Sequence, residues 1–180
     1  MRGLAARLSK WVTRLEEACL AGGILGIASL TIANVVGRVL FDHSLAFAEE
    51  LSQFLIVFVT FLGIGYAAAK GRHIRMTAVY DQLGKRWRQR LAIVISATTS
   101  ALLFYLAYLG LEYSLGTMRG LGSVSPVLEV PLWTVYLSAP LGFGLGGIQY
   151  ALAVVRNLES DEVYLSYEVR DDEPAPTEGI

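Results

Sequence analysis

Polar residues on either side of one short connection are the groups in this sequence best placed to do chemistry. Asn34 and Arg38 are four positions apart and therefore share a helical face, and Glu49, Glu50 and Gln53 follow a short hairpin. In an apolar environment an arginine and a glutamate are each costly alone, so we expect an ion pair between Arg38 and Glu49 or Glu50. Two alternatives stay open: a carboxylate that couples transport to protons or sodium ions, and side chains that snorkel into lipid headgroups.

Four long apolar segments have to position these side chains. Of the 180 residues, 54% are hydrophobic and 17% are charged, against about a quarter charged in ordinary globular proteins. A bilayer core about 30 Å thick needs about 20 apolar residues per helical span. The sequence supplies spans at about residues 18–40, 51–69, 91–111 and 132–155, without the short alternating segments of a membrane β-barrel. We therefore predict an all-α membrane protein with four transmembrane helices, the fourth kinked at Pro140.

Basic residues predict the orientation of these spans. Lysine and arginine are dense before the first span and between the second and third, and sparse in the other two connections. Since basic loops stay in the cytoplasm, we expect both termini on the cytoplasmic side. The basic loop also contains aromatic residues, but its place between two spans favours topology control and attraction to anionic headgroups over a nucleic-acid partner.

The segments outside the spans are expected to lie against the membrane or in solvent. Residues 1–17 have an apolar face that includes Trp11 and a basic opposite face, which favours an amphipathic helix lying flat in the cytoplasmic interface. A straight N-terminal continuation of the first span is the alternative. Residues 156–180 form an acidic tail that we expect to be disordered from Glu159 onward.

Small residues recur every three or four positions in three of the spans, which allows helix backbones to approach closely. Contact within the chain and contact with a partner subunit both stay open. The predicted packing positions are Gly22, Gly26, Ala33 and Gly37 in the first span, Gly63 in the second, and Ser138, Gly142 and Gly146 in the fourth. The predicted interfacial anchors are Trp11, Trp87 and Trp133, together with Arg72 and His73.

Catalysis and cofactor binding find little support in the sequence. His43 and His73 are expected on opposite sides of the membrane, which argues against a bis-histidine haem. Cys19 is the single cysteine, so the chain has neither an internal disulfide nor a cysteine-based metal cluster. No base lies at the depth of a serine nucleophile, and a glycine-rich phosphate loop is missing. We expect no enzymatic activity, no cofactor and no metal.

The central part of the chain, about residues 15–155, resembles the small membrane subunit of TRAP transporters, the tripartite ATP-independent periplasmic type, also called the DctQ family. The resemblance rests on an ordered set of residues rather than on one motif. The set comprises Asn34 and Arg38, Glu49 and Glu50, Gly63, the segment Gly71-Arg72-His73-Ile74, and Pro131-Leu132-Trp133 with Tyr136 and Pro140-Leu141-Gly142. The N-terminal helix and the acidic tail lie outside it.

This resemblance implies a function in solute uptake across the bacterial inner membrane. The chain would be the small permease subunit that braces a large multi-span membrane subunit. The large subunit would import an organic acid by symport with an ion gradient, after delivery by a periplasmic binding protein. The outer loop from Gly116 to Pro131 would then face the binding protein.

Three other functions remain to be weighed. A self-sufficient homodimeric transporter would use Glu49, Glu50 or Arg38, but such carriers keep an essential carboxylate deep in the bilayer, whereas these residues lie at its edge. A small membrane enzyme or electron carrier would need a catalytic or redox cluster at one depth. A membrane-anchored assembly factor without a transport role is compatible with the sequence and stays open. The sequence gives no indication of the substrate, the coupling ion or the stoichiometry.

Overall fold

The computed structural model describes the backbone of residues 2–70, 84–160, 163, 164 and 166, and the side chains from Trp11 onward. Its long helices are α1 (Arg2–Phe41), α2 (Ala46–Ala69), α4 (Lys85–Leu111) and α7 (Ser138–Glu159). Its short elements are the π-helix η1 (Glu112–Met118), α5 (Arg119–Leu121) and α6 (Leu132–Tyr136). Each predicted span coincides with a helical segment long and apolar enough to cross a membrane. The prediction of an all-α membrane protein with four spans is confirmed.

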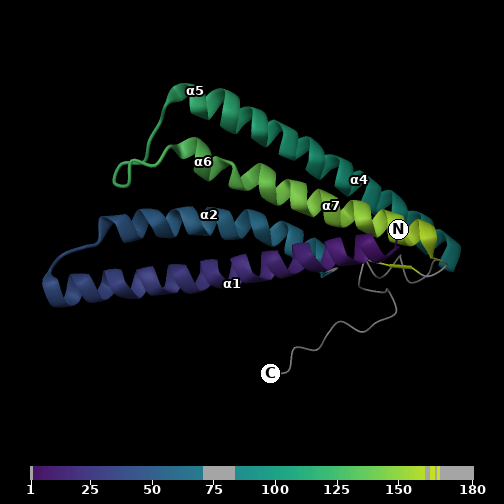
Figure 1. Ribbon diagram of the computed structural model, residues 1–180, viewed down its shortest axis with the longest axis horizontal. Helices are drawn as coiled ribbons and strands as arrows, with labels where there is room; N and C mark the ends of the chain where they lie inside the picture. Colours follow the sequence, from purple (N-terminus) through teal and green to yellow (C-terminus); the bar gives the residue numbers. More distant parts are fainter. Residues whose placement is uncertain (1, 71–83, 161–162, 165, 167–180) are drawn as a thin grey trace.

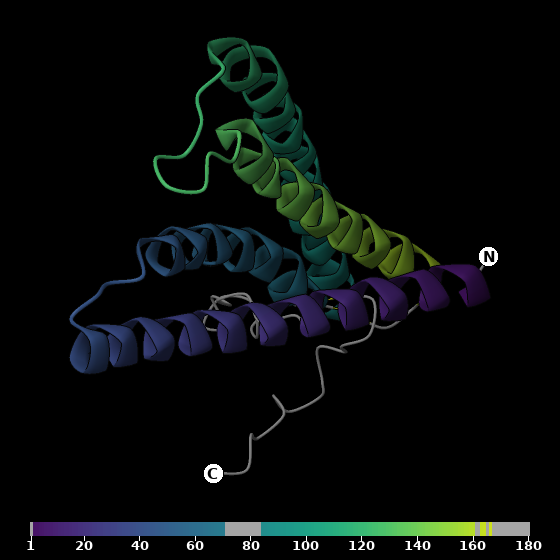
Figure 2. The same ribbon diagram turned by 60° about the vertical axis from the view of Figure 1, so that its left-hand side comes forward.

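The helices pack in a row rather than around a common axis. α1 packs on α2, α2 on α7, and α7 on α4. Figures 1 and 2 show that the helices lie close together at one end and spread apart at the other. We call the close end, where α1 begins and α7 ends, the inner end, and the opposite one the outer end. A small core of Ala68, Leu103 and Tyr150 joins α2, α4 and α7.

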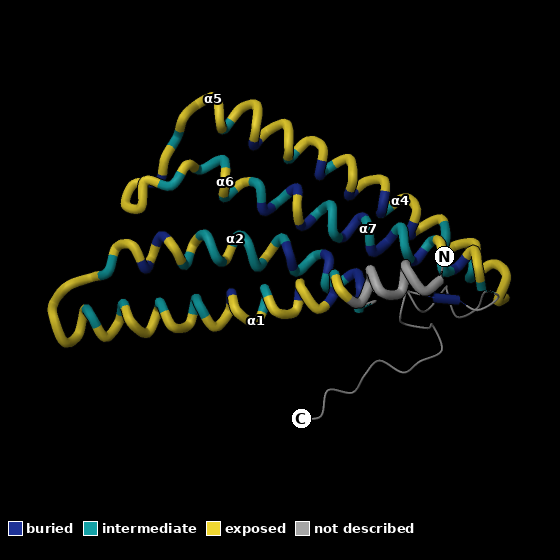
Figure 3. The backbone as a smooth tube through the Cα atoms, viewed as in Figure 1, coloured by how far each residue is buried: buried dark blue, intermediate teal, exposed yellow. Residues whose placement is uncertain are grey.

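Burial rises from one side of this row to its centre, as Figure 3 shows. Of the residues in the most apolar window of each span, 6% are buried in the first, 17% in the second, 28% in the third and 44% in the fourth. Large apolar side chains such as Leu25 and Ile32 of α1 are therefore exposed. In a membrane helix such side chains are solvated by lipid or covered by another helix. α7 is thus the most buried of the four spans, and α1 is the least buried.

α1 is a single helix of 40 residues. At 1.5 Å per residue it is about 60 Å long, twice the thickness of a bilayer core of about 30 Å. Residues 2–17 are helical, but they continue into the first span without a break, as in the straight-extension alternative. Trp11 and Leu15 are exposed, whereas Thr13 and Glu16 are buried. This end of α1 therefore turns polar side chains toward its neighbours and apolar ones outward.

The third span is longer than the sequence predicted. Helical backbone continues through η1 and α5 to Leu121, so residues 116–121, expected in the outer loop, extend the helix instead. The helix ends at Gly122, whose φ of 61° is left-handed and suits glycine. Tyr113 of η1 packs edge-on against Tyr136 of α6, with ring centroids 5.8 Å apart. The π-helix is thereby joined to the start of the fourth span.

Pro140 interrupts the fourth span, which is divided at Leu137 into α6 and α7. The break follows from the proline ring, because Pro140 has no N–H to donate to the carbonyl of Tyr136 one turn earlier. The ring packs against α4 at Gly110, where a methyl group would lie 3.2 Å from it. The break therefore coincides with a close contact between the third and fourth spans.

The chain beyond α7 folds back on the inner end. Val163, Tyr164 and Ser166 are buried. The side-chain amide of Asn157 donates to the carbonyl of Tyr164 at 2.7 Å, and the Tyr164 N–H donates to the Asn157 side-chain oxygen at 2.9 Å. The acidic composition predicted disorder from Glu159 onward. Val163, Tyr164 and Ser166 are instead buried, and the Asn157 side-chain amide binds Tyr164. The rest of the tail lies outside the described residues.

Candidate functional site

Asn34 fastens the connection between the first two helices. Its side-chain oxygen accepts hydrogen bonds from the N–H of Leu45 at 2.8 Å and from the hydroxyl of Ser44 at 3.3 Å. The first N–H groups of a helix have no partner within it, and α2 has no cap from its own side chains. Asn34 of α1 takes that role. One turn further on, Gly37 lets the hairpin approach, because a methyl group there would lie 3.2 Å from the carbonyl oxygen of His43.

Glu50 fastens the outer loop, which comprises residues 122–131. Glu50 is the fifth residue of α2 and is 7% exposed. The Oε2 atom accepts hydrogen bonds from the N–H of Leu128 at 2.7 Å and from the N–H of Val127 at 3.2 Å. Hydrogen bonds from backbone N–H groups to a charged acceptor are among the stronger ones in proteins. Glu50 therefore ties α2 to a loop that begins about 70 residues later in the chain.

The outer loop is compact in itself. The N–H of Ser125 donates to the carbonyl of Val130 at 2.9 Å, and the Ser125 hydroxyl accepts from the N–H of Val130 at 3.0 Å. Ser125 is buried under this turn, whereas Val127 and Leu128 at its tip are exposed. Glu50 and Ser125 thus hold two apolar side chains outward on an ordered loop. Exposed apolar side chains in such a setting are typical of a protein contact surface.

The ion pair expected between Arg38 and Glu49 or Glu50 is not formed, although all three residues are described. Arg38 and Glu49 are exposed, and so is Gln53. The reason lies in helical phase, because consecutive residues of a helix point about 100° apart. Glu50 faces the outer loop and Glu49 faces outward. The five predicted polar residues therefore gather at the outer end, but Asn34 and Glu50 bind backbone groups instead of an ionic partner.

Two of the predicted packing positions in α7 lie directly at its crossing with α2. A methyl group at Gly142 would strike the backbone of Phe61, and one at Gly146 would lie 3.3 Å from Ile64. Ser138, one turn before Gly142, is buried. Small residues are what allows membrane helices to come this close. Among the glycine contacts between the backbones of α2 and α7, the one at Gly142 lies nearest the outer end.

The predicted stripe of small residues on α1 divides into two parts. Gly26 faces α2, where a methyl group would lie 3.2 Å from Leu55. Gly22 has open space around it, and Ala33 is exposed. Gly63 of α2 lies opposite α1 at an ordinary contact distance. Part of the stripe thus packs within the chain, and part of it faces away from the chain's own helices.

An apolar groove opens where α2 and the fourth span separate, beyond Gly142 toward the outer end. Its volume is about 350 Å³. It is lined by Phe54, Leu55, Phe58, Thr134, Val135, Ser138 and Leu141. The hydroxyls of Thr134 and Ser138 each donate at 2.7 Å to the backbone carbonyl three residues earlier, that of Pro131 and that of Val135. The groove therefore presents no charged side chain to an anionic substrate.

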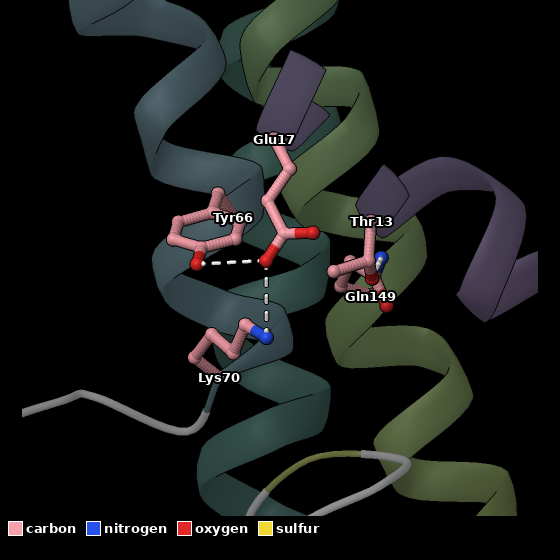
Figure 4. Close-up of polar contacts among 5 residues, drawn as sticks. All are labelled: Thr13, Glu17, Tyr66, Lys70 and Gln149. Atoms are coloured by element: carbon pink, nitrogen blue, oxygen red, sulfur yellow. Dashed lines mark hydrogen bonds and ion pairs between the residues drawn. The ribbon is translucent and has the colours of Figure 1, made fainter. Parts of the chain in front are cut away.

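Two polar contacts lie side by side at the inner end, as Figure 4 shows, and one is exposed while the other is buried. Glu17 of α1 accepts a hydrogen bond from the hydroxyl of Tyr66 at 3.1 Å and pairs with Lys70 at 3.3 Å. The side-chain amide of Gln149 donates to the hydroxyl of Thr13 at 3.4 Å, and both residues are buried. The first contact joins α1 to α2 and the second joins α1 to α7.

Sequence reasoning missed Glu16 and Gln149, which are fully buried here. Gln149 follows Gly146 by three positions and therefore shares a helical face with the small residues of this span. This spacing could have predicted that Gln149 is buried. Glu16 lies in a charged N-terminal stretch, and its direction toward α2 follows only once α1 is continuous through this point.

The predicted anchors lie at both ends of the bundle. Trp11 and Trp87 are exposed at the inner end, where the guanidinium of Arg90 lies 5.7 Å from the Trp87 ring centre. Trp133 lies at the outer end, with Arg119 at 5.6 Å. The two remaining predicted anchors, which lie outside the described residues with most of the basic loop, are Arg72 and His73.

These features define a small four-helix membrane protein whose polar side chains fasten its own loops and helix crossings. Within the described residues, no three His, Cys, Asp or Glu side chains are grouped so as to hold a metal ion. Residues 27–160 match the family described as tripartite ATP-independent periplasmic transporters, DctQ component. The chain belongs to this family of transporter subunits: it is a small permease subunit of a TRAP transporter and a multi-pass protein of the inner membrane, as the resemblance predicted.

Named relatives agree with this assignment. The ectoine TRAP transporter small permease protein TeaB of Halomonas elongata is 43% identical over 169 residues, which cover 94% of this chain and 87% of TeaB. The C4-dicarboxylate TRAP transporter small permease protein DctQ of Rhodobacter capsulatus is 32% identical over 57% of this chain and 44% of its own length. The isethionate TRAP transporter permease protein DctMQ of Oleidesulfovibrio alaskensis is 23% identical over 74% of this chain but only 22% of its own. TRAP small permeases pair with large membrane subunits, and the long DctMQ chain is consistent with that pairing. None of these relatives supports the alternative of a self-sufficient small transporter.

Proposed function

We propose that this subunit braces the large membrane subunit of its transporter through the outward face of α1. The observation that supports this most is the low burial of α1 by the chain's own helices, compared with α7 at the centre of the row. The face carries the small residues Gly22 and Ala33 among exposed apolar side chains such as Leu25 and Ile32. Because lipid is as apolar as these side chains, close packing at small residues is what holds membrane helices together.

A matched pair of glycine substitutions tests this proposal. Gly22 and Gly144 both have open space where a side chain would be added, the first on α1 and the second on α7. Gly22→Ile should leave the small subunit folded and reduce the recovery of the co-expressed large subunit on a tagged small subunit by about tenfold, equivalent to about 1.4 kcal/mol. Gly144→Ile should leave the recovery unchanged. Equal recovery with both variants would place the brace elsewhere.

We also propose that the outer end faces the periplasm and that the outer loop contacts the periplasmic binding protein. The dense basic residues before the first span and between the second and third favour cytoplasmic termini. The exposed Val127 and Leu128, held outward by Glu50, supply an apolar contact surface. In the assembled transporter, Val127→Ser with Leu128→Ser should weaken binding-protein affinity. Leu158→Ser removes an exposed leucine from the inner end and should not. Unchanged affinity in the loop variant would contradict the contact.

For the transported solute we propose a small carboxylate-bearing compound recognised by the other two components. The groove of this chain has no charged lining, which supports placing recognition outside it. The TeaB relative makes ectoine the first solute to test, followed by a C4-dicarboxylate. Uptake into cells that express all three components, compared with cells lacking only the binding protein, distinguishes these solutes.

A further inference from the structure

Glu16 is a fully buried acidic side chain at the inner end of the bundle. Its exposed fraction is 0%, and neither carboxylate oxygen has a hydrogen-bond partner. The neighbouring Glu17 is 49% exposed and accepts a hydrogen bond from Tyr66 while pairing with Lys70. Two adjacent glutamates on one helix therefore have opposite surroundings. The contacts of Glu17 with Tyr66 and Lys70 do not explain why Glu16 is buried.

Two glycines form the space that receives the Glu16 carboxyl group. A methyl group at Gly65 of α2 would strike the carboxyl, and it would lie 3.3 Å from the backbone nitrogen of Gly146 in α7. The side chain of Glu16 thus lies at the crossing of α2 and α7, and any residue larger than glycine at position 65 would displace it. One turn earlier on the same face of α1 is Thr13, in contact with Gln149. The surroundings are helical backbone and uncharged side chains.

No cation in the described part of the chain pairs with this carboxyl. Lys70, the basic residue that α2 presents at this end, is held by Glu17 at 3.3 Å. On α1 itself Arg14 is exposed. Arg156 of α7 lies against Tyr164, 4.6 Å from its ring centre, and donates to the Tyr164 hydroxyl at 3.2 Å. Tyr66 of α2 and Tyr150 of α7 are neutral at physiological pH. An ionised carboxylate without a partner is very costly in such surroundings, whereas a neutral acid is tolerated.

We propose that Glu16 is a proton-binding site, and that its neutral carboxyl group locks α1 into the crossing of α2 and α7. Release of the proton places an uncompensated negative charge at a three-helix contact, which favours withdrawal of α1. Since α1 is also the proposed brace, the protonation of Glu16 sets how firmly the brace is held. This consequence rests on the proposed function, but the proton site itself does not.

Infrared spectroscopy of the purified full chain tests the site directly. With isotope-labelled glutamate carboxyls, the wild-type protein at neutral pH should show the carbonyl stretch of a protonated glutamic acid. Glu16→Gln should lose this band, and Glu17→Gln should keep it. Absence of the band from the wild-type protein would overturn the proposal, and that measurement requires no variant to fold.

Thermal unfolding gives the second readout. An unfolded glutamate releases its proton near pH 4.3, so a folded state that retains the proton loses stability as the pH rises. Between about pH 6 and about pH 9 the unfolding midpoint of the wild type and of Glu17→Gln should fall by about 3 °C or more, and that of Glu16→Gln should fall less. An equal slope in all three proteins would overturn the proposal. So would a stabilisation by sodium ions that Glu16→Gln abolishes, because it would mean an ionised carboxylate holding a metal cation. A change in large-subunit recovery with no infrared band would support the brace but not the proton site.

Discussion

Each end of this molecule has a pair of adjacent glutamates, one buried and one exposed, and the two pairs make opposite contacts. At the outer end Glu49 is exposed while Glu50 is buried and accepts two backbone hydrogen bonds from a distant loop. At the inner end Glu17 is exposed and Glu16 is buried, but the exposed member makes the polar contacts and the buried one makes none. In both pairs helical phase decides which residue is buried. What it meets there depends on how closely the helices approach.

Helix separation explains this difference. At the inner end the glycines Gly65 and Gly146 bring α2 and α7 together, so backbone and apolar side chains surround whatever is buried. Beyond Gly142 the same helices diverge, and the outer loop reaches toward α2 at this open end (Figure 2), where the N–H groups of Val127 and Leu128 donate to Glu50. Backbone donors of the loop therefore reach Oε2 of Glu50, although its Oε1 has no partner, whereas neither oxygen of Glu16 finds a donor where the helices use their own N–H groups.

The largest effect is expected at the point where the helices begin to diverge. Gly142→Leu should disrupt the crossing, because even a methyl group there meets the backbone of Phe61, which has no alternative rotamer to adopt. We expect a loss of about 3 kcal/mol or more of unfolding free energy, or failure to obtain folded protein. Thermal unfolding of the purified chain measures it. Gly144→Leu, two residues further on in open space, is the matched control. Wild-type stability in Gly142→Leu would mean that the glycine contact does not set the divergence.

A smaller effect is expected where the outer loop is fastened. Glu50→Ala leaves the N–H groups of Val127 and Leu128 without their acceptor, which should lower the unfolding free energy by about 1.5–3 kcal/mol. Hydrogen exchange at these two amides should accelerate with it. Glu49→Ala removes the same charge from an exposed position and should change stability by less than about 0.5 kcal/mol. Equal losses in both variants would show that stability depends on the negative charge at this end and not on the hydrogen bonds between Glu50 and the outer loop.

Removal of the Asn34 cap should have a milder effect at the same end. Asn34→Ala takes the acceptor from the N–H of Leu45 at the start of α2, which should cost about 1 kcal/mol. Asn34→Asp keeps an oxygen in place and should retain most of the stability. Exchange of the Leu45 amide reports the cap directly. If alanine and aspartate behave alike, the hairpin is held by packing at Gly37 rather than by this hydrogen bond.

The sequence was sufficient for the spans and insufficient for the partners of individual polar residues. Apolar runs with few charges require helices in a bilayer, so all four spans followed from hydropathy and length. Pro140 likewise breaks the fourth span for a reason internal to the residue. The pairing of Arg38 failed because spacing along a chain fixes depth but not which neighbour a helix turns toward. Glu50 instead meets a loop that lies far along the sequence.

Composition also misleads where a few residues override it. The acidic tail begins with residues that Asn157 holds against the bundle, and one buried side-chain amide was enough to order them. Similarly, residues 116–121 have the glycine content of a loop, yet they continue a helix as far as Gly122, where a left-handed residue is needed. The stripe on α1 showed which positions are small, but the packing of α1 on α2 decides that Gly26 is internal and Gly22 is free.

The smallest effect is expected from the exposed member of the inner pair. Glu17 and Lys70 are 49% and 38% exposed, so water and salt screen their attraction, and the side chains lose freedom on pairing. Lys70→Met and Glu17→Gln should each leave the unfolding midpoint unchanged within error at physiological salt, with a slight loss at low salt. Their double variant should equal the sum of the singles. A large, salt-insensitive coupling in this cycle would show that the inner end is fastened by its surface charges. Glu16 in its glycine crossing would then lose its place as the residue that distinguishes the two ends.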